Sequence, residues 1–379
     1  MSRPIKILFA GGGTGGHLYP AVAIADRISQ LMIGRGDVDI RFVGTRHGLE
    51  YRIRDTLGYP LDLINMRGLV RSFTPRNLLL PFVIVGALIK ASLLLGRFSP
   101  DVVVGTGGYV SWPVLRMAHA RRIPTVLQEQ NSYPGIATRH AARQAGRIYL
   151  GFERAADYLK TSAEIIVTGN PVRASILGGS RNEAMKTFGL DPNKQTILVL
   201  GGSQGARAIN NAVLKSLQNK TLTDKYQLLW QTGKGDYKDV TARAGDKASG
   251  CSLFPFADRM DLVYAATDVA VARAGALTLA ELAAAGIPSI LVPYPHAAED
   301  HQRKNAQEFA QRGLAVVVDQ NDLDKTDLIG AAVDLLASDR FGAMKASVVA
   351  ATRDKEPAVD VIAEDIINLI DDARKGDRR

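Results

Sequence analysis

The 379-residue chain contains very little cysteine. Cys251 is the single cysteine, so no disulfide can form within the chain, and a zinc site built on several cysteines is excluded. The layout of a secretory signal is also lacking, because the short apolar stretch IKILFA runs directly into a glycine-rich loop. Both observations favour the cytoplasm as the compartment.

Acidic residues are scarce in the first part of the chain. Residues 1–170 carry 21 Lys and Arg against 11 Asp and Glu, whereas residues 171–379 carry 26 against 27. We therefore expect the first part to face an anionic partner: nucleic acid, a phospholipid surface or a phosphorylated substrate. Aromatic residues are only 6% of the chain. No aromatic-interleaved basic stripe, zinc-finger or RNP pattern occurs, so nucleic acid is not the expected partner.

Apolar residues are plentiful, at 46%, and the length predicts two domains. Strand and helix patterns alternate from IKILFA and YPAVAIADRISQLM onward, and the order restarts near residue 196 with TILVLGGSQGARAINNAVLKSL. This rhythm predicts an α/β protein with two Rossmann-like, doubly wound parallel-sheet domains, at residues 1–170 and 171–355, followed by a terminal helix. Ligands of such sheets bind at the carboxyl ends of the strands, so we expect a site in a cleft between the domains.

A glycine-rich loop, GGGTGG, separates the first predicted strand from the first helix. Gly11, Gly13 and Gly16 satisfy G-x-G-x-x-G, and the helix N-terminus behind them favours an anion. Arg46, at the end of the second strand, leaves an NADP site open. His17 at the helix start is expected to be neutral and able to accept a proton, or else to be a capping or packing residue.

Two further glycine loops follow predicted strands. GTGGYVS, at residues 105–111, lies in the same half as the first loop, and two such loops on one sheet suit a diphosphate. The alternative is that these glycines form tight turns that need a positive φ. The third loop, GGSQGAR, belongs to the second half and suits a second phosphorylated ligand.

Two Asp-x-Asp pairs match the metal-binding pattern of many sugar-nucleotide transferases. Asp37 and Asp39 precede a strand rather than follow one, and Asp322 and Asp324 lie in a polar loop. We interpret both pairs as solvated turns and expect no protein-bound metal.

The most apolar stretch is LLLPFVIVGALIKASLLLG, at residues 78–96. A membrane span needs about 20 mostly apolar residues. This stretch contains Pro81 and Lys90 and lies inside a strand–helix rhythm, so we interpret it as a helix of the first domain. Basic residues at 71, 76, 90 and 97 punctuate it, a composition that suits a rim touching anionic lipid.

Taken together, several motifs resemble the MurG family, the bacterial transferases that move N-acetylglucosamine from UDP-N-acetylglucosamine to undecaprenyl-linked muramyl-pentapeptide. They are GGGTGGHLYPA, GTGGYVSWP, QEQNSYPG, GNPVR, GGSQGARAIN and ARAGALTLAELAAAGIPSILVPYPHAAEDHQRKNA, and they run from residue 11 to residue 306. The resemblance implies the GT-B arrangement of two Rossmann-like domains across a deep cleft, with the terminal helix, about residues 356–376, packed on the first domain. It also implies an inverting reaction that makes lipid II from lipid I through a β-1,4 linkage.

The same resemblance assigns residues to the site. His17 is the implied general base for the C4 hydroxyl of the muramyl sugar. The implied acceptor-binding residues are Gly13, His17, Gly107, Gly108 and Tyr109. The implied donor-binding residues are Thr14, Gly15, Gly16, Asn131, Arg173, Ser203, Phe256, Ala257, Ala276, Leu277, Thr278, Glu281 and Gln302.

Several of the implied donor contacts have a physical reason. The Asn131 carboxamide can bind sugar hydroxyls, and Arg173 would stabilise the departing UDP. The helix beginning at Ala276 offers amides to the α-phosphate, and Glu281 would accept hydrogen bonds from the ribose hydroxyls. The family more often has a larger apolar residue where Ala257 stands.

The partners implied are UDP-N-acetylglucosamine, lipid I, the anionic cytoplasmic face of the inner membrane, to which the protein would bind peripherally, and other cell-wall synthesis and division proteins. No cofactor is expected. The alternatives are another type-B transferase with a different lipid acceptor, an NADP-dependent oxidoreductase, and a sugar-nucleotide-binding protein without catalysis.

Overall fold

The computed structural model describes residues 3–66, 80–202, 205–218, 222, 224–353 and 355–376. These residues form two compact units. The first unit extends to Pro171 and takes up the chain again from Glu356, and the second spans Val172–Lys355. The predicted α/β class with two parallel sheets is confirmed, and the cleft expected between them stays a prediction.

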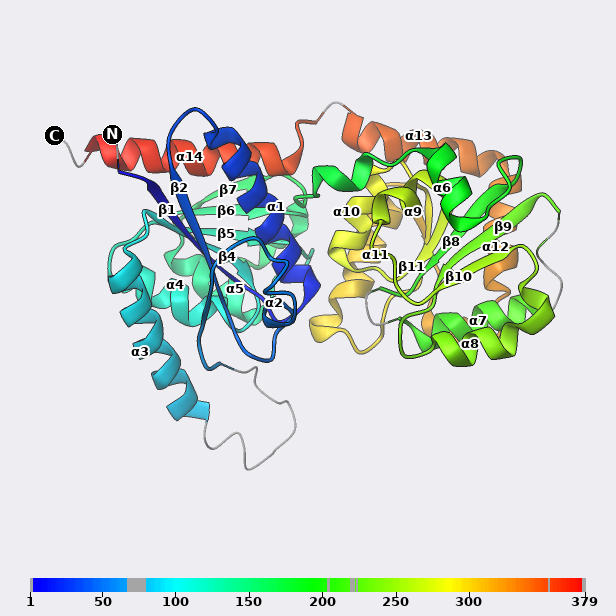
Figure 1. The fold of residues 1–379 in the computed structure, drawn as a ribbon, viewed down its shortest axis with the longest axis horizontal. Coiled ribbons are helices and arrows are strands. Elements are labelled where there is room, and N and C mark those ends of the chain that lie inside the picture. The colour runs from blue at the N-terminus through cyan, green and yellow to red at the C-terminus, as the bar shows by residue number, and fades with distance from the viewer. Residues whose placement is uncertain are drawn as a thin grey trace. The chain divides into compact units, whose positions relative to one another are not determined.

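Seven parallel strands form the sheet of the first unit, in the order β3-β2-β1-β4-β5-β6-β7 (Figure 1). They are β1 (Ile5–Gly11), β2 (Val38–Gly44), β3 (Leu61–Leu63), β4 (Val102–Gly107), β5 (Thr125–Glu129), β6 (Arg147–Leu150) and β7 (Glu164–Val167). The helices are α1 (Gly15–Met32), α2 (Leu49–Arg52), α3 (Leu80–Phe98), α4 (Ser111–Ala120), α5 (Ile136–Ala141) and α14 (Ala358–Gly376).

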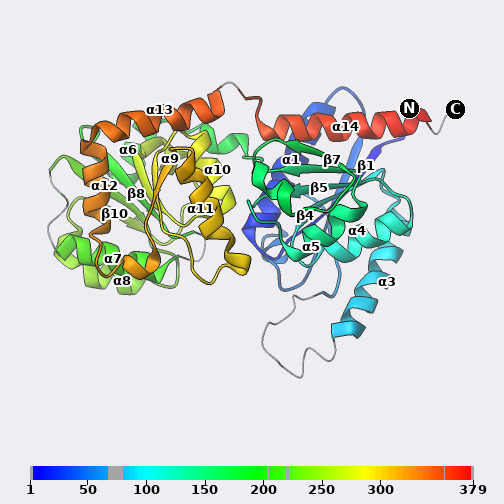
Figure 2. The same cartoon turned by 180° about the vertical axis from the view of Figure 1, so that it is seen from behind.

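Both faces of this sheet are buried, as expected for parallel strands covered by helices. Along β1, Ile7 and Phe9 belong to the apolar cluster shared with α1 and α14, whereas Leu8 and Ala10 belong to the cluster shared with α3, α4 and α5. Figure 2 shows α4 and α5 on the face opposite α1. The side-chain period of two in the strand therefore gives each helical layer its own core.

The terminal helix α14 is part of the first unit and lies beside α1 (Figure 1). Its residues in the core cluster with α1 recur at helical spacing: Ile362, Ala363, Ile366, Ile367 and Ile370. Polar contacts add to this apolar face. The Asp365 carboxylate accepts hydrogen bonds from Arg147 and from the Tyr149 hydroxyl.

Helix α3 covers the sheet with only one of its faces. Ala87, Ala91, Leu95 and Phe98 are buried, whereas Phe82, Val85, Ile89 and Leu93 are exposed. Its amino-terminal half extends beyond the rest of the unit (Figure 2). Among the described residues, α3 alone is long and apolar enough to cross a membrane by length and composition, which is weak evidence for a span.

Six parallel strands form the sheet of the second unit, in the order β10-β9-β8-β11-β12-β13. They are β8 (Gln195–Leu200), β9 (Tyr226–Gln231), β10 (Cys251–Phe254), β11 (Val269–Ala272), β12 (Ser289–Leu291) and β13 (Ala315–Val317). The helices are α6 (Arg181–Phe188), α7 (Arg207–Gln218), α8 (Tyr237–Ala244), α9 (Met260–Ala266), α10 (Ala276–Ala284), α11 (His301–Gln311), α12 (Leu328–Ala337) and α13 (Asp339–Arg353).

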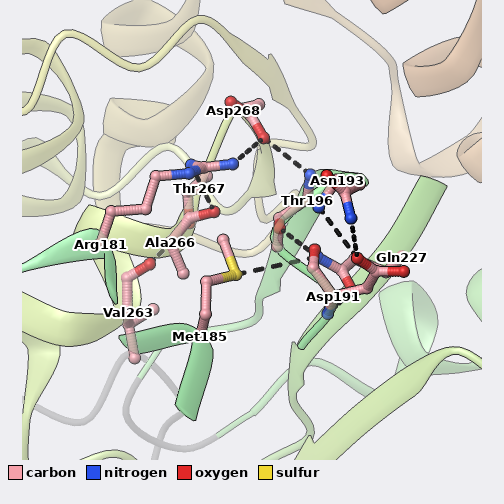
Figure 3. Close-up of polar contacts among 10 residues, drawn as sticks. All are labelled: Arg181, Met185, Asp191, Asn193, Thr196, Gln227, Val263, Ala266, Thr267 and Asp268. Carbon is pink, nitrogen blue, oxygen red and sulfur yellow. Dashed lines mark hydrogen bonds and ion pairs between the residues drawn. The ribbon is translucent and has the colours of Figure 1, made fainter. Parts of the chain in front are cut away.

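A polar network fixes the amino ends of the strands in the second unit (Figure 3). The Asp268 carboxylate accepts from the Thr196 N–H at 2.8 Å and from the Arg181 guanidinium at 3.1 Å. Gln227 donates to the Thr196 hydroxyl at 3.0 Å and to the Asp191 carbonyl at 2.9 Å. These hydrogen bonds therefore connect β8, β9 and the start of β11 at the end of the sheet opposite its carboxyl edge.

Candidate active site

Two glycine loops of the first unit meet at the carboxyl ends of the neighbouring strands β1 and β4. His17 lies in the first turn of α1, and Gly107 ends β4 with φ +99°. A Cβ atom at Gly107 would lie 2.7 Å from His17 Nδ1. The absence of a side chain at Gly107 therefore allows the imidazole to approach the second loop.

The hydrogen bonds of His17 define which ring nitrogen carries the proton. Nδ1 lies 3.0 Å from the Thr106 carbonyl oxygen and 3.0 Å from Gln130 Oε1. Both partners are acceptors, so Nδ1 donates, and in the neutral ring Nε2 keeps its lone pair. The Thr106 hydroxyl in turn donates to the His17 carbonyl at 2.8 Å.

Gln130 is the residue that orients His17 and to which the sequence motifs assigned no role. Its Nε2 donates to the Thr106 carbonyl at 2.8 Å and to the Gln128 carbonyl at 3.0 Å, which leaves Oε1 to accept from His17. Asn170 donates to the Gln130 carbonyl at 2.9 Å. The motif QEQN contains Gln130, but no spacing rule distinguishes it from its neighbours.

Asn131 follows β5 at the same edge of the sheet. The buried Glu129 carboxylate accepts from the Asn131 N–H at 3.0 Å and from its carboxamide nitrogen at 3.2 Å. Glu129 therefore fixes the side chain of this predicted donor residue.

The remaining predicted residues of the first unit lie in the same two loops. Thr14 is the N-cap of α1 and is exposed, and its side chain makes no capping hydrogen bond. Gly15 and Gly16 open the helix. Gly13, with φ +88°, has its N–H bonded to Glu50, and the Tyr109 ring lies 3.4 Å from where a Cβ of Gly13 would be.

In the second unit, Glu281 lies on α10 next to an aromatic hydroxyl. The Tyr264 hydroxyl donates to Glu281 Oε2 at 2.7 Å. Burial raises the pKa of Glu281, while the Tyr264 hydrogen bond and the charge of Arg173 act in the opposite direction. Two predicted donor residues, Glu281 and Arg173, are thus close enough to influence each other.

Three segments at the carboxyl ends of β8, β9 and β10 are joined by Gln231. Its Oε1 accepts from the Ala257 N–H at 3.0 Å, and its Nε2 donates to the Gly202 carbonyl at 3.3 Å. Beside Ala257, the exposed Phe256 ring has Lys234 Nζ 5.5 Å from its centroid. Ser203, a predicted donor residue in this third glycine loop, lies outside the described residues.

Helix α10 begins at Ala276, so Ala276, Leu277 and Thr278 lie in its first turn, and the contact of their amides with a phosphate stays a prediction. Nearby, Gln302 on α11 accepts from the Tyr294 N–H at 3.0 Å. Arg273 is almost fully buried and donates to the carbonyls of residues 292 and 293 at 3.0 and 3.2 Å, so it shapes the loop that carries Tyr294.

The predicted set is thus distributed over both units. The acceptor residues, together with Thr14, Gly15, Gly16 and Asn131, gather at the carboxyl edge of the first sheet. The other described donor residues lie at the corresponding loops and helices of the second. Asp37 and Asp322 lie outside both groups, and within the described ranges no three His, Cys, Asp or Glu side chains form a metal-binding group.

Comparison with known proteins gives the same family along almost the whole chain. Residues 7–150 match the N-terminal domain of glycosyltransferase family 28, and residues 196–361 match its C-terminal domain. The chain is 43% identical over 349 residues to the UDP-N-acetylglucosamine--N-acetylmuramyl-(pentapeptide) pyrophosphoryl-undecaprenol N-acetylglucosamine transferase of Chlorobium limicola, which covers 90% of this chain and 94% of that protein. It is 41% identical over 371 residues to the protein of the same name from Salinibacter ruber, with 98% of each covered.

A solved structure agrees with these relatives. The crystal structure of MurG from Acinetobacter baumannii matches with a TM-score of 0.73 and 25% identity, covering 96% of this chain and 100% of that one. These findings decide against the NADP-dependent oxidoreductase that the glycine loop alone left open. The chain therefore belongs to glycosyltransferase family 28 and, within it, to the MurG family of N-acetylglucosamine transferases.

Proposed function

We propose that the chain transfers N-acetylglucosamine from UDP-N-acetylglucosamine to the C4 hydroxyl of undecaprenyl-pyrophosphoryl-muramyl-pentapeptide, lipid I, and so makes lipid II for peptidoglycan. The observation that carries the proposal is the similarity, over nearly the full length, to transferases whose names state this reaction. The side chains gathered at the carboxyl edges of the two sheets support the proposal, because their chemistry suits the steps given below.

His17 is the proposed general base. The acceptor C4 oxygen attacks the anomeric carbon, its proton passes to His17 Nε2, and the bond from that carbon to the UDP oxygen breaks. Attack from the side opposite UDP inverts the anomeric carbon and gives a β linkage from an α donor. The contacts of Nδ1 with Thr106 and Gln130 support this role because they orient the ring and stabilise the imidazolium that forms.

The second unit is the proposed donor site. UDP leaves as an anion, and Arg173 with the amino end of α10 would stabilise its diphosphate. Glu281 would accept from the two ribose hydroxyls, and the backbone at Ala257 would read the uracil edge. Asn131, Gln302 and the first glycine loop would bind the transferred sugar.

The first unit is also the proposed membrane-binding part of a peripheral enzyme at the cytoplasmic face of the inner membrane. The exposed apolar side chains of α3 lie beside the exposed Lys90 and Arg97, a combination suited to the surface of an anionic bilayer. The excess of basic residues in residues 1–170 would also strengthen binding to an anionic bilayer.

The test is UDP release from UDP-N-acetylglucosamine with and without a short-chain lipid I analogue. We expect release to require the analogue, and His17→Ala to lower kcat by about 10²- to 10⁴-fold while UDP-N-acetylglucosamine still binds. Donor binding without any analogue-dependent release would contradict the proposal and point to another lipid acceptor or to a binding protein. Full turnover by His17→Ala would refute the role of His17 alone.

A further inference from the structure

A fully buried carboxylate lies behind the first glycine loop, and the proposed mechanism does not use it. Glu50 is the second residue of the short helix α2 and has 0% of its surface exposed. Three glycines make room for its side chain. A Cβ atom at Gly12 would lie 2.7 Å from the Glu50 carboxyl carbon, and Cβ atoms at Gly44 and Gly48 would lie closer still to Glu50 atoms.

The Glu50 carboxylate joins two loops through backbone donors. Oε2 accepts from the Gly13 N–H at 2.8 Å, and Oε1 accepts from the Thr45 N–H at 2.8 Å and from the Thr45 hydroxyl at 3.5 Å. A buried carboxylate is costly unless its oxygens are hydrogen-bonded, and here both oxygens are. The arrangement therefore holds the loop after β1 and the loop after β2 in one geometry.

A third loop meets the same cluster. The Thr45 hydroxyl lies 3.5 Å from the Tyr109 hydroxyl, which belongs to the loop after β4. Strands β2, β1 and β4 are adjacent in the sheet, so three neighbouring loops meet around Glu50 and Thr45. Two of them carry the residues proposed to hold the acceptor and its base.

The loop that Glu50 holds also borders an open space. A cavity of about 330 Å³ is lined by Thr45, Arg46, His47, Leu63, Ile64, Asn65 and Lys90. Arg46 and Lys90 give this cavity the positive charge that a diphosphate-bearing acceptor requires. Glu50 is not among the residues that line this cavity, and its carboxylate oxygens accept from backbone N–H groups instead of facing a ligand.

We propose that Glu50 is a positioning residue of the acceptor site. Glu50 accepts the hydrogen bond of the Gly13 N–H and so fixes the left-handed backbone at Gly13. This determines where α1 begins, and with it the positions of His17 and Tyr109. This inference rests on the proposed function, because it assigns Glu50 to the acceptor half of the same reaction.

Glu50→Gln is the primary test, since it keeps the shape and replaces one accepting oxygen with a donor that opposes a backbone N–H. We expect kcat/KM for the lipid I analogue to fall about 10- to 100-fold, the fold-change of one lost hydrogen bond to a charged group. The Kd for UDP, whose proposed diphosphate, ribose and uracil contacts all belong to the second unit, should change less than about twofold, a difference within the ordinary scatter of surface substitutions. Glu153→Gln, an exposed glutamate of the same unit, is the matched control and should behave as the wild type.

A second variant displaces the carboxylate without removing it. Gly48 has φ −77°, which alanine adopts freely, so Gly48→Ala acts through its clash with Glu50. It should reproduce the acceptor defect of Glu50→Gln. In a Glu50→Ala background the clash is gone, and Gly48→Ala should add no further defect.

The outcomes separate this inference from the proposed function. If the wild type shows no acceptor-dependent turnover, the proposed function fails. If the wild type turns over and both variants keep wild-type acceptor kinetics, the role of Glu50 fails alone. A loss of activity that only follows the folded fraction, with unchanged KM values in the remaining enzyme, would also overturn it, because that is the signature of a purely structural residue.

Discussion

At the scale of single residues, the environment of Glu281 determines the pH range in which its carboxylate can accept hydrogen bonds from the donor. Burial raises the pKa of its carboxyl above the ordinary 4.5, so the charged form is lost at a higher pH than for an exposed glutamate. If the ribose hydroxyls donate to the carboxylate, donor binding requires the charged form. We predict that the KM for UDP-N-acetylglucosamine rises as the pH falls through this raised pKa.

Tyr264 gives a direct control on that pH dependence. Its hydroxyl donates to Glu281 and thereby lowers the pKa of the carboxyl. Tyr264→Phe should therefore move the acidic limb of the KM profile to higher pH, and Glu281→Gln should flatten the profile and raise the donor KM about 10- to 100-fold. An unchanged profile in both variants, measured by initial rates between pH 5 and pH 8 (roughly the range that brackets such a shift), would contradict the role of Glu281.

At the scale of elements, the terminal helix α14 completes the core of the first unit. Ile366 has 0% exposure and packs in the cluster that contains α1 and β1. We predict that Ile366→Ala lowers the free energy of unfolding by about 2–5 kcal/mol, which urea denaturation of the full chain would measure. Ile136→Ala, at a 54% exposed position of α5, is the matched control and should change stability little. Equal midpoints for the two variants would show that α14 is not integral to this core.

The exposed apolar side chains of α3 are the expected contact with lipid. Replacing Phe82 and Leu93, which are 77% and 68% exposed, with serine should weaken sedimentation with phosphatidylglycerol vesicles and leave the melting temperature unchanged. Ile33→Ser, at an 80% exposed position after α1, should leave vesicle binding intact. Equal losses for both variants would mean that α3 is not a specific lipid contact.

The sequence predicts these strands and helices, but it does not predict all of the contacts between them. Alternating apolar strands and glycine loops predict both sheets, because a period of two and a helix start are local properties. The roles of Glu50 and Gln130 are set by strands distant in sequence. Glu50 meets Gly13 only after β1 and β2 pair, and nothing in the segment GLEYR marks a buried carboxylate. Asp365 likewise meets Tyr149 only when α14 packs.

At the scale of the whole molecule, the excess of positive charge lies within residues 1–170. Attraction between a basic surface and anionic lipid is screened by salt over a Debye length of about 8 Å at physiological ionic strength. We predict that binding to anionic vesicles weakens as salt is raised from about 0.05 to 0.5 M, and that binding to neutral phosphatidylcholine vesicles is weak at every salt concentration. Salt-independent binding of equal strength to both lipids would show that apolar insertion alone anchors the protein.

The glycosidic bond that the chain makes defines its activity. The most direct measurement is mass spectrometry and NMR of the lipid product after incubation with UDP-N-acetylglucosamine and a lipid I analogue. We predict a product heavier by one N-acetylglucosamine residue, joined through a β linkage to C4 of the muramyl sugar. Unmodified lipid despite full donor binding, or a product with an α linkage, would contradict the proposed reaction.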